Sequence, residues 1–232
     1  KSRIKPDSHH RNATYAAMVH SLDENVGRIL NKLEELGLAE STVVIFTSDN
    51  GGYINNFRGQ AVTNNFPLRS GKGSLYEGGV RVPLLIRWPG TAKPGGVCDR
   101  PVCSIDFYRT ILEMAGLPGD AKHNAGVDGL SLVPLLRDPG ASWARNELYF
   151  HYPHYYETTT PVSAVRAGEW KLLEYLEDGR LELYNLAKDP SETRNLASEL
   201  PDVAARLKAQ LDQWRQSVHA QMPAANPGYQ GK

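Results

Sequence analysis

The stretch TVVIFTSDNGG (residues 42–52) places a β-branched apolar run directly before Asp49, Asn50 and two glycines. The run is short and apolar throughout, which predicts a strand buried on both faces. Upstream, residues 12–36 carry apolar side chains three and four positions apart, which predicts an amphipathic helix that ends at Gly37. A long helix that leads into such a strand indicates an α/β fold with a mostly parallel sheet.

Downstream of this strand, the apolar period changes near residues 138–147. Residues 83–88 predict a second buried strand and residues 104–115 a helix, whereas later apolar runs are short and separated by Gly or Pro turns. A final helix is predicted over residues 201–218, so this half is expected to be a small antiparallel sheet with one helix, an α+β unit. The expected divisions are 1–140 for the α/β part, 141–222 for the α+β subdomain and 223–232 for a flexible tail.

Composition excludes several classes of protein. The 232 residues include 26 Lys+Arg and 26 Asp+Glu, so the formal net charge is zero, and nothing indicates a nucleic acid partner. No apolar run approaches the roughly 18–20 residues of a membrane span. Two cysteines, Cys98 and Cys103, are too few for a disulfide-dense scaffold, and neither has the local features of a nucleophile.

Asp49 and Asn50 follow the predicted strand, and the carboxyl ends of strands are where ligands bind in open α/β sheets. A carboxylate and an amide carbonyl are hard oxygen ligands, which favour calcium or magnesium over zinc. The alternative is a plain Asx turn that bends at Gly51 and Gly52. Because a hard cation needs about six oxygens, the remaining ligands must come from elsewhere.

Residues 49–80 contain no clear helix or strand, so either this assignment is wrong or the segment is a functional loop. Within it, Lys72 is flanked by Gly71 and Gly73, which allow a close approach of backbone and ligand, and its ammonium could face an oxyanion. The alternative is an exposed turn lysine. Glu77 and Arg81 are expected to form an ion pair that holds the same loop.

The run from His151 to Tyr156 is dense in aromatic and imidazole side chains. It is a candidate sugar-binding segment, with His151 and His154 as substrate-binding residues. It is equally consistent with an edge strand interrupted by Pro153.

Several motifs follow one another along the chain. They are Tyr15-x-x-Met18 with Asp23-x-x-Val26-Gly27, Thr47-Ser48-Asp49-Asn50-Gly51, the block from Gly71 to Pro83, Glu182-Leu183-Tyr184-Asn185-Leu186, and Asp189-Pro190-x-Glu192-x-x-Asn195-Leu196. Taken in order, these motifs resemble the C-terminal part of a type I, formylglycine-dependent sulfatase of the alkaline-phosphatase superfamily, and in particular bacterial carbohydrate sulfatases. The resemblance covers nearly the whole chain.

The resemblance implies an alkaline-phosphatase-like mixed sheet flanked by helices. It implies that Asp49 and Asn50 hold Ca²⁺, in preference to Mg²⁺, and that Lys72 contacts the sulfate group. The formylglycine of the family arises from a C/S-x-P/A-x-R motif, which this sequence lacks, as it lacks the paired aspartates that complete the metal site. We therefore expect a missing N-terminal half of the same protein as partner, and no activity from this chain alone.

The expected function is hydrolysis of sulfate esters, on a sulfated small molecule or, in preference, a sulfated glycan. One alternative is a phosphodiesterase or phosphonate hydrolase of the same superfamily. The other is a non-catalytic sugar-binding module built on the aromatic run, which would leave the Asp49–Arg81 segment unexplained. The resemblance also implies a periplasmic or secreted location, which the residues themselves do not indicate.

Overall fold

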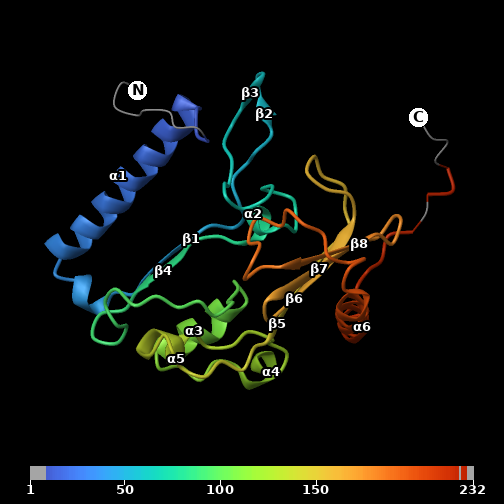
Figure 1. The fold of residues 1–232 in the computed structure, drawn as a ribbon. Helices are drawn as coiled ribbons and strands as arrows, with labels where there is room; N and C mark the ends of the chain where they lie inside the picture. The colour runs from blue at the N-terminus through green and yellow to red at the C-terminus, as the bar shows by residue number, and fades with distance from the viewer. Residues whose placement is uncertain (1–8, 225, 229–232) are drawn as a thin grey trace. The chain divides into compact units, whose positions relative to one another are not determined.

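The computed structural model describes residues 9–224 and 226–228 (Figure 1). The chain divides into two compact units that are discontinuous in sequence. One contains the residues up to Gly27, Thr47–Leu84 and the residues from Glu147 onward, and the other contains Arg28–Phe46 and Leu85–Asn146. The first unit therefore joins the segment that carries Asp49 and Lys72 to the C-terminal sheet.

Helix α1 (Ala13–Glu35) confirms the predicted N-terminal helix. Asn12 caps it, because its Oδ1 accepts hydrogen bonds from the backbone N–H groups of Thr14 and Tyr15 at 3.1 and 3.0 Å. After the helix, Gly37 adopts a φ of 66°, the left-handed conformation that suits a helix end. Among the described residues, every helix is too short or too polar to cross a bilayer.

Strands β1 (Val44–Thr47) and β4 (Leu84–Arg87) form a two-stranded sheet, which confirms both predicted strands. The prediction that they are buried on both faces is wrong for the described chain, since their residues are half-buried or exposed and Leu85 is 59% exposed. The physical reason is that, within the described residues, each strand has only the other as its neighbour. A short 3-10 helix, Ala39–Ser41, precedes β1.

In the second unit, helix α3 (Asp106–Met114) confirms the predicted helix over residues 104–115. Its first residue, Asp106, is fully buried and binds the Arg145 guanidinium through two hydrogen bonds of 2.6 Å. The loop-rich region that follows contains two short helices, α4 (Ala121–Asn124) and α5 (Val133–Arg137), which the sequence analysis did not predict.

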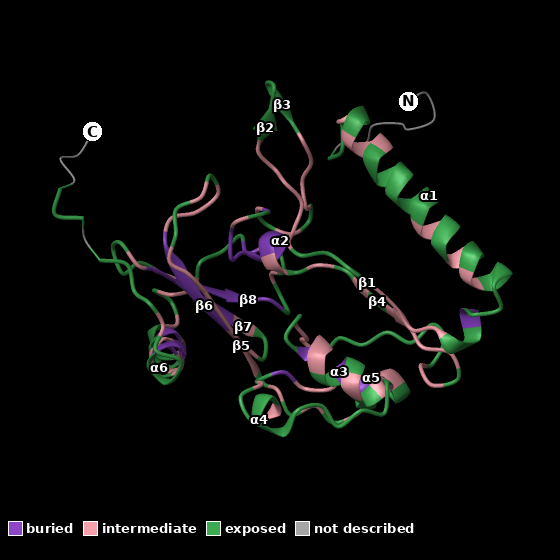
Figure 2. Ribbon diagram, turned by 180° about the vertical axis from the view of Figure 1, so that it is seen from behind, coloured by how far each residue is buried: buried purple, intermediate pink, exposed green. Residues whose placement is uncertain are grey.

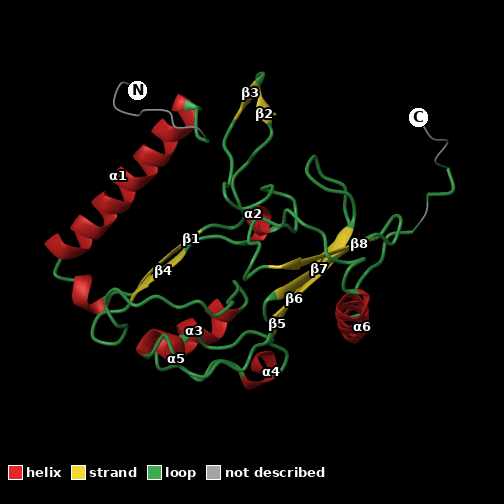
Figure 3. Cartoon of the chain, in the orientation of Figure 1, coloured by secondary structure: helices red, strands yellow, loops and turns green. Residues whose placement is uncertain are grey.

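The C-terminal sheet is antiparallel and has the strand order β5-β6-β7-β8 (Figure 3). Its strands are β5 (Glu147–Tyr152), β6 (Val162–Ala167), β7 (Trp170–Tyr175) and β8 (Leu181–Asn185). Gly168 and Gly179 have φ angles of 58° and 70° in the connecting turns, as expected of hairpins. Helix α6 (Pro201–Ser217) lies on one face, so the predicted small antiparallel sheet with one helix is confirmed.

Alternate side chains of this sheet enter two different cores, seen as buried strands in Figure 2. One face packs on α6 through Val165, Leu172, Leu183, Leu207 and Leu211. The other face packs against Leu75 and Tyr76 in the loop that also carries Lys72; its members include Val162, Ala164, Leu173, Tyr175 and Tyr184. The loop of residues 69–81 is therefore a structural layer of the C-terminal sheet.

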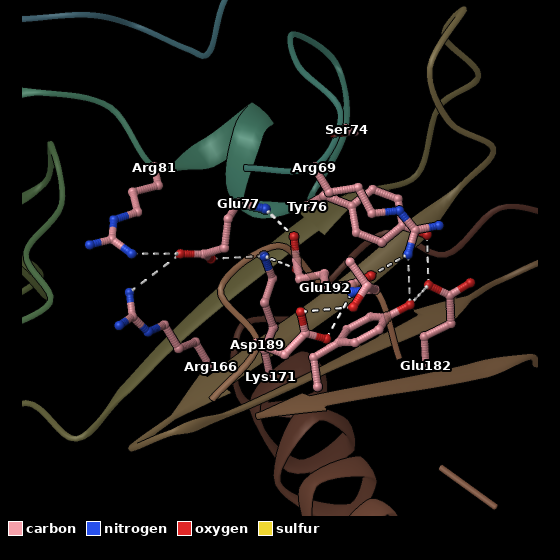
Figure 4. A network of polar contacts seen from close by, with 12 residues as sticks. Arg69, Ser74, Tyr76, Glu77, Arg81, Arg166, Lys171, Glu182, Asp189 and Glu192 are labelled. Carbon is pink, nitrogen blue, oxygen red and sulfur yellow. Dashed lines mark hydrogen bonds and ion pairs between the residues drawn. The ribbon is translucent and has the colours of Figure 1, made fainter. Parts of the chain in front are cut away.

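A buried ionic cluster joins this loop to the sheet (Figure 4). Lys171 of β7 places its Nζ 2.9 Å from carboxylate oxygens of both Glu77 and Glu192, and all three side chains are almost fully buried. Glu77 begins the short helix α2 (Glu77–Val80), and its backbone N–H donates to Glu192 Oε2 at 2.7 Å. Arg81 and Arg166 approach Glu77 Oε2 at 3.8 and 3.9 Å, so the expected Glu77–Arg81 pair is present but is longer than the 2.9 Å contact between Glu77 and Lys171.

Replacing Lys171 tests how far this cluster holds the loop. Lys171→Met should lower the free energy of unfolding by about 3–5 kcal/mol, because it leaves two buried carboxylates without their shared cation. Burial already raises the pKa of Glu192 above its unfolded value, so ionising Glu192 costs stability as the pH rises. Without the Lys171 charge, the ionised form of Glu192 is still less stable in the folded protein. The free energy of unfolding lost in Lys171→Met should therefore grow between about pH 5 and about pH 8.

Urea unfolding of the protein at several pH values measures this effect. Lys208→Met is the matched control, since Lys208 pairs with Glu174 and Asp212 at a partly exposed site and should cost below about 1 kcal/mol. Equal losses in the two variants would contradict a special role for the buried cluster.

Candidate active site

The turn after β1 presents Asp49 and Asn50. Asp49 is exposed and Asn50 half-buried, and the Ser48 hydroxyl donates to the Asn50 carbonyl at 2.8 Å. In residues 9–224 and 226–228, neither the Asp49 carboxylate nor the Asn50 side-chain amide has a hydrogen-bonded partner. The side-chain oxygens of Asp49 and Asn50 thus lie at the end of a strand with no partner among the described residues.

Backbone hydrogen bonds bring this turn against the Lys72 loop. The Lys72 N–H donates to the Gly52 carbonyl at 3.1 Å, and the Gly51 N–H donates to the Gly79 carbonyl at 2.9 Å. Lys72 is exposed, and its ammonium has no hydrogen-bonded or ionic partner within the described ranges. The sequence-predicted Asp49, Asn50 and Lys72 therefore lie on adjoining backbone segments, and their roles stay predictions.

The close approach requires glycine at two positions. A Cβ on Gly51 would lie 1.7 Å from the carbonyl oxygen of Gly78, and a Cβ on Gly71 would lie 2.4 Å from the carbonyl oxygen of Gly52. Real Cβ atoms do not make such contacts, so no other residue fits without a backbone shift. The glycines that flank the candidate site residues thus have a specific packing reason.

Asn65 cross-links the two segments, and the sequence analysis missed it. Its Oδ1 accepts from the Gly52 N–H at 2.9 Å, and its Nδ2 donates to the Ser70 carbonyl at 2.9 Å. One amide thus satisfies a donor of the Asp49 turn and an acceptor of the Lys72 loop. No periodic pattern marks such a residue, because its partners lie in irregular backbone.

Arg69 anchors the start of the Lys72 loop on the sheet. Its guanidinium donates to the Tyr184 hydroxyl and to the Glu192 carbonyl, both at 2.9 Å, and lies over the Tyr76 ring. The hydroxyls of Tyr76 and Tyr184 donate to Glu182 at 2.6 and 2.8 Å. Burial and these hydrogen bonds raise the pKa of both phenols, so both remain protonated donors at neutral pH.

The connection between β5 and β6 also reaches the Lys72 loop. The Thr158 hydroxyl donates to the Lys72 carbonyl at 2.8 Å. The Tyr156 ring lies so close to Gly73 that a Cβ there would be 2.1 Å from the ring. Part of the aromatic run singled out in the sequence is therefore beside the candidate site.

The two predicted substrate-binding histidines have different surroundings. His151 is half-buried on β5, where its Nδ1 is 2.7 Å from Ser163 Oγ and its Nε2 is 2.8 Å from the Gln221 carbonyl. His154 is exposed and meets the Tyr152 ring edge-to-face. Both assignments stay predictions.

The donor chemistry at the turn fits a hard cation. Carboxylate and amide oxygens are the ligands that Ca²⁺ prefers, and Asp49 and Asn50 offer two of the required set. Among the described residues, no group of three or more His, Cys, Asp or Glu could hold a metal ion. Calcium binding by Asp49 and Asn50 therefore stays a prediction, with the remaining ligands to come from elsewhere.

The structure offers no activated thiol. Cys98 is exposed, whereas burial raises the pKa of the half-buried Cys103 and so disfavours its thiolate. Neither cysteine gains support as a nucleophile.

Substitution of Gly51 tests the close approach. Gly51→Ala should lower the free energy of unfolding by about 2–4 kcal/mol, because the new methyl group meets the Gly78 carbonyl oxygen. Gly27→Ala is the control: it lies inside α1 with nothing within 4 Å of the added Cβ, and it should be neutral or add about 0.5–1 kcal/mol. Similar shifts of the urea midpoint in both variants would contradict the packing argument.

Two family models match the chain. The model described as Sulfatase matches residues 3–117, and the model described as N-sulphoglucosamine sulphohydrolase, C-terminal, matches residues 70–217. Together they extend over most of the chain, and the second covers well over half of it.

Known proteins agree with these models. A sulfatase of Formosa agariphila is 39% identical over 92% of this chain and 41% of its own length. The N-acetylglucosamine-6-O-sulfatase of Bacteroides thetaiotaomicron is 32% identical over 78% of this chain and 31% of its own. The solved structure of BT4656 with its substrate D-glucosamine-2-N,6-O-disulfate superposes with a TM-score of 0.71 and 28% identity, covering 88% of this chain and 40% of that one.

The chain spans less than half the length of these curated relatives. The matches nevertheless cover most of this chain's own length. The chain therefore belongs to the sulfatase family.

Proposed function

We propose that this chain is the C-terminal part of an enzyme that hydrolyses sulfate esters of carbohydrates. The observation that carries the proposal is the hydrogen bond from the Lys72 N–H to the Gly52 carbonyl, which joins the Asp49–Asn50 turn to the lysine loop. The carbohydrate preference draws support from the relative named for N-acetylglucosamine 6-O-sulfate and from the structure solved with a glucosamine disulfate.

In this proposal, Asp49 and Asn50 hold Ca²⁺ through their side-chain oxygens. The bound ion would supply positive charge to the sulfate oxygens. Lys72 would bind the sulfate group and stabilise the negative charge that develops on the departing ester oxygen. Its exposed ammonium and its unfilled donors suit this task, because a lysine already paired within the fold could not bind an anion as strongly.

The nucleophile lies outside this sequence in the proposal. No C/S-x-P/A-x-R motif occurs in the 232 residues, and family resemblance assigns the nucleophile to a formylglycine in an N-terminal half. Helix α1 is consistent with such a partner, since none of its 23 residues is buried and Met18, Leu22 and Ile29 are more than half exposed. An N-terminal half would cover these apolar side chains.

Lys72→Ala in the complete protein tests the proposed role of the lysine. It should reduce kcat on an aryl sulfate by at least about 100-fold, because a charge that stabilises the transition state is lost. The thermal midpoint should barely change, since the Lys72 side chain makes no hydrogen bond or ion pair with the described residues. Lys188→Ala, another exposed lysine, is the control and should keep full activity. Unchanged turnover in Lys72→Ala would remove the lysine from the mechanism.

Residues 1–232 produced alone provide a second test. This piece should release no sulfate from an aryl sulfate, with or without added Ca²⁺, because the nucleophile and part of the metal site are absent from its sequence. Circular dichroism establishes whether the piece is folded in the assay. Sulfate release by a homogeneous preparation would refute the proposed division of the active site.

A further inference from the structure

An exposed carboxylate lies beside the Lys72 loop and is not used in the proposed mechanism. Glu157, in the connection between β5 and β6, accepts a hydrogen bond at Oε2 from the Tyr53 hydroxyl at 3.3 Å and another from Asn55 Nδ2. Its other oxygen, Oε1, has no hydrogen-bonded partner among the described residues. The carboxylate is thus fixed on one side and open on the other.

Two hydrogen bonds made by neighbouring residues place Glu157 next to the candidate site. Thr158, the next residue, donates its hydroxyl to the Lys72 carbonyl at 2.8 Å. Tyr53, one of the donors to Glu157, directly follows Gly52, whose carbonyl accepts from the Lys72 N–H at 3.1 Å. Glu157 is therefore adjacent in sequence to one residue that bonds the Lys72 backbone, Thr158, and its partner Tyr53 is adjacent to the other, Gly52.

We infer that Glu157, fixed by Tyr53 and Asn55, is a specificity subsite for the sugar that bears the sulfate ester. This inference rests on the proposed function. A carboxylate accepts hydrogen bonds from hydroxyl and ammonium groups, and its charge repels a second sulfate or a carboxylate at the same place. The subsite therefore selects sugars with a hydroxyl or amine beside the ester and rejects those with a second anion there.

The subsite complements the lysine. Lys72 carries the positive charge for the sulfate group, whereas Glu157 carries a negative charge beside it. Together the two charges favour a sugar with one sulfate group over a sugar with several anionic groups. Because Glu157 is exposed, salt screens its charge, and the discrimination against a second anion should weaken as ionic strength rises.

A purely structural role makes a different prediction. If Glu157 served only to hold the β5–β6 connection, Glu157→Gln would change little, because the glutamine carbonyl can still accept from Tyr53 and Asn55. Glu157→Gln removes the charge alone and so separates recognition from support of the loop.

The experiment compares two monosaccharide sulfate esters that differ only at the neighbouring carbon, one with a free amine or hydroxyl and one with a second sulfate. The complete wild-type protein should prefer the first by at least about 10-fold in kcat/KM. Glu157→Gln should bring the two within about 3-fold, through KM rather than kcat. Glu199→Gln, an exposed carboxylate paired with Arg194, is the control and should keep the wild-type ratio.

An aryl sulfate without a sugar separates the possible failures. If the wild-type protein and Glu157→Gln hydrolyse it equally and the sugar ratio is also unchanged, the subsite is refuted and the sulfatase proposal stands. If the wild-type protein hydrolyses no sulfate ester, both proposals fall. Inhibition of wild-type aryl sulfate hydrolysis is a check that needs no variant. It uses the same two sugars without the ester to be cleaved, so that one carries only the neighbouring amine or hydroxyl and the other keeps only its neighbouring sulfate. Weaker inhibition by the amine or hydroxyl sugar than by the sugar that keeps its sulfate would also overturn the inference.

Discussion

The candidate site depends on how closely two backbone segments approach each other after strand β1. The Lys72 N–H reaches the Gly52 carbonyl, and the Gly51 N–H reaches the Gly79 carbonyl. These bonds form only because Gly51 and Gly71 lack side chains that would occupy the same space. The turn that carries Asp49 and Asn50 and the loop that carries Lys72 thus become neighbours through main-chain contacts, which do not depend on the conformations of long side chains.

The C-terminal sheet packs against the loop that carries Lys72 and so fixes the position of that loop. Because side chains alternate along a strand, Leu172 enters the core under α6 while Lys171 and Leu173 face the lysine loop. A one-residue slip of β7 would place Lys171 against α6 and an apolar side chain against Glu77. The register of a sheet distant in sequence therefore fixes the position of the loop that carries Lys72.

Local patterns predicted most elements of this fold. Apolar periodicity predicted α1, α3 and α6 to within a few residues of their observed bounds. The exposure of β1 escaped prediction, since burial depends on what covers a strand rather than on its own residues. The links from Lys171 to Glu77 and Glu192 also escaped prediction, because the first joins residues 94 positions apart and neither has a local signature.

The sequence indicated the candidate site residues by their residue type and motif, but it did not indicate the residues that hydrogen-bond to the surrounding loops. Asp49, Asn50 and Lys72 stand in motifs with distinctive glycines, so the sequence pointed to them. Asn65 and Thr158 act through hydrogen bonds to irregular backbone, and a polar residue in a loop has many equivalent partners. Only the three-dimensional path of the chain selects among them.

The contrast between two lysines gives the strongest physical argument for a function at this site. Lys171 is buried between two carboxylates, so its charge is neutralised within the fold and stabilises the structure. Lys72 is exposed, and no described residue neutralises it. The fold nonetheless holds the Lys72 backbone on both sides of its Cα, because the N–H donates to the Gly52 carbonyl and the C=O accepts from the Thr158 hydroxyl. A side chain that the fold does not need, on a backbone that the fold restrains, is the arrangement expected where the charge acts on a ligand.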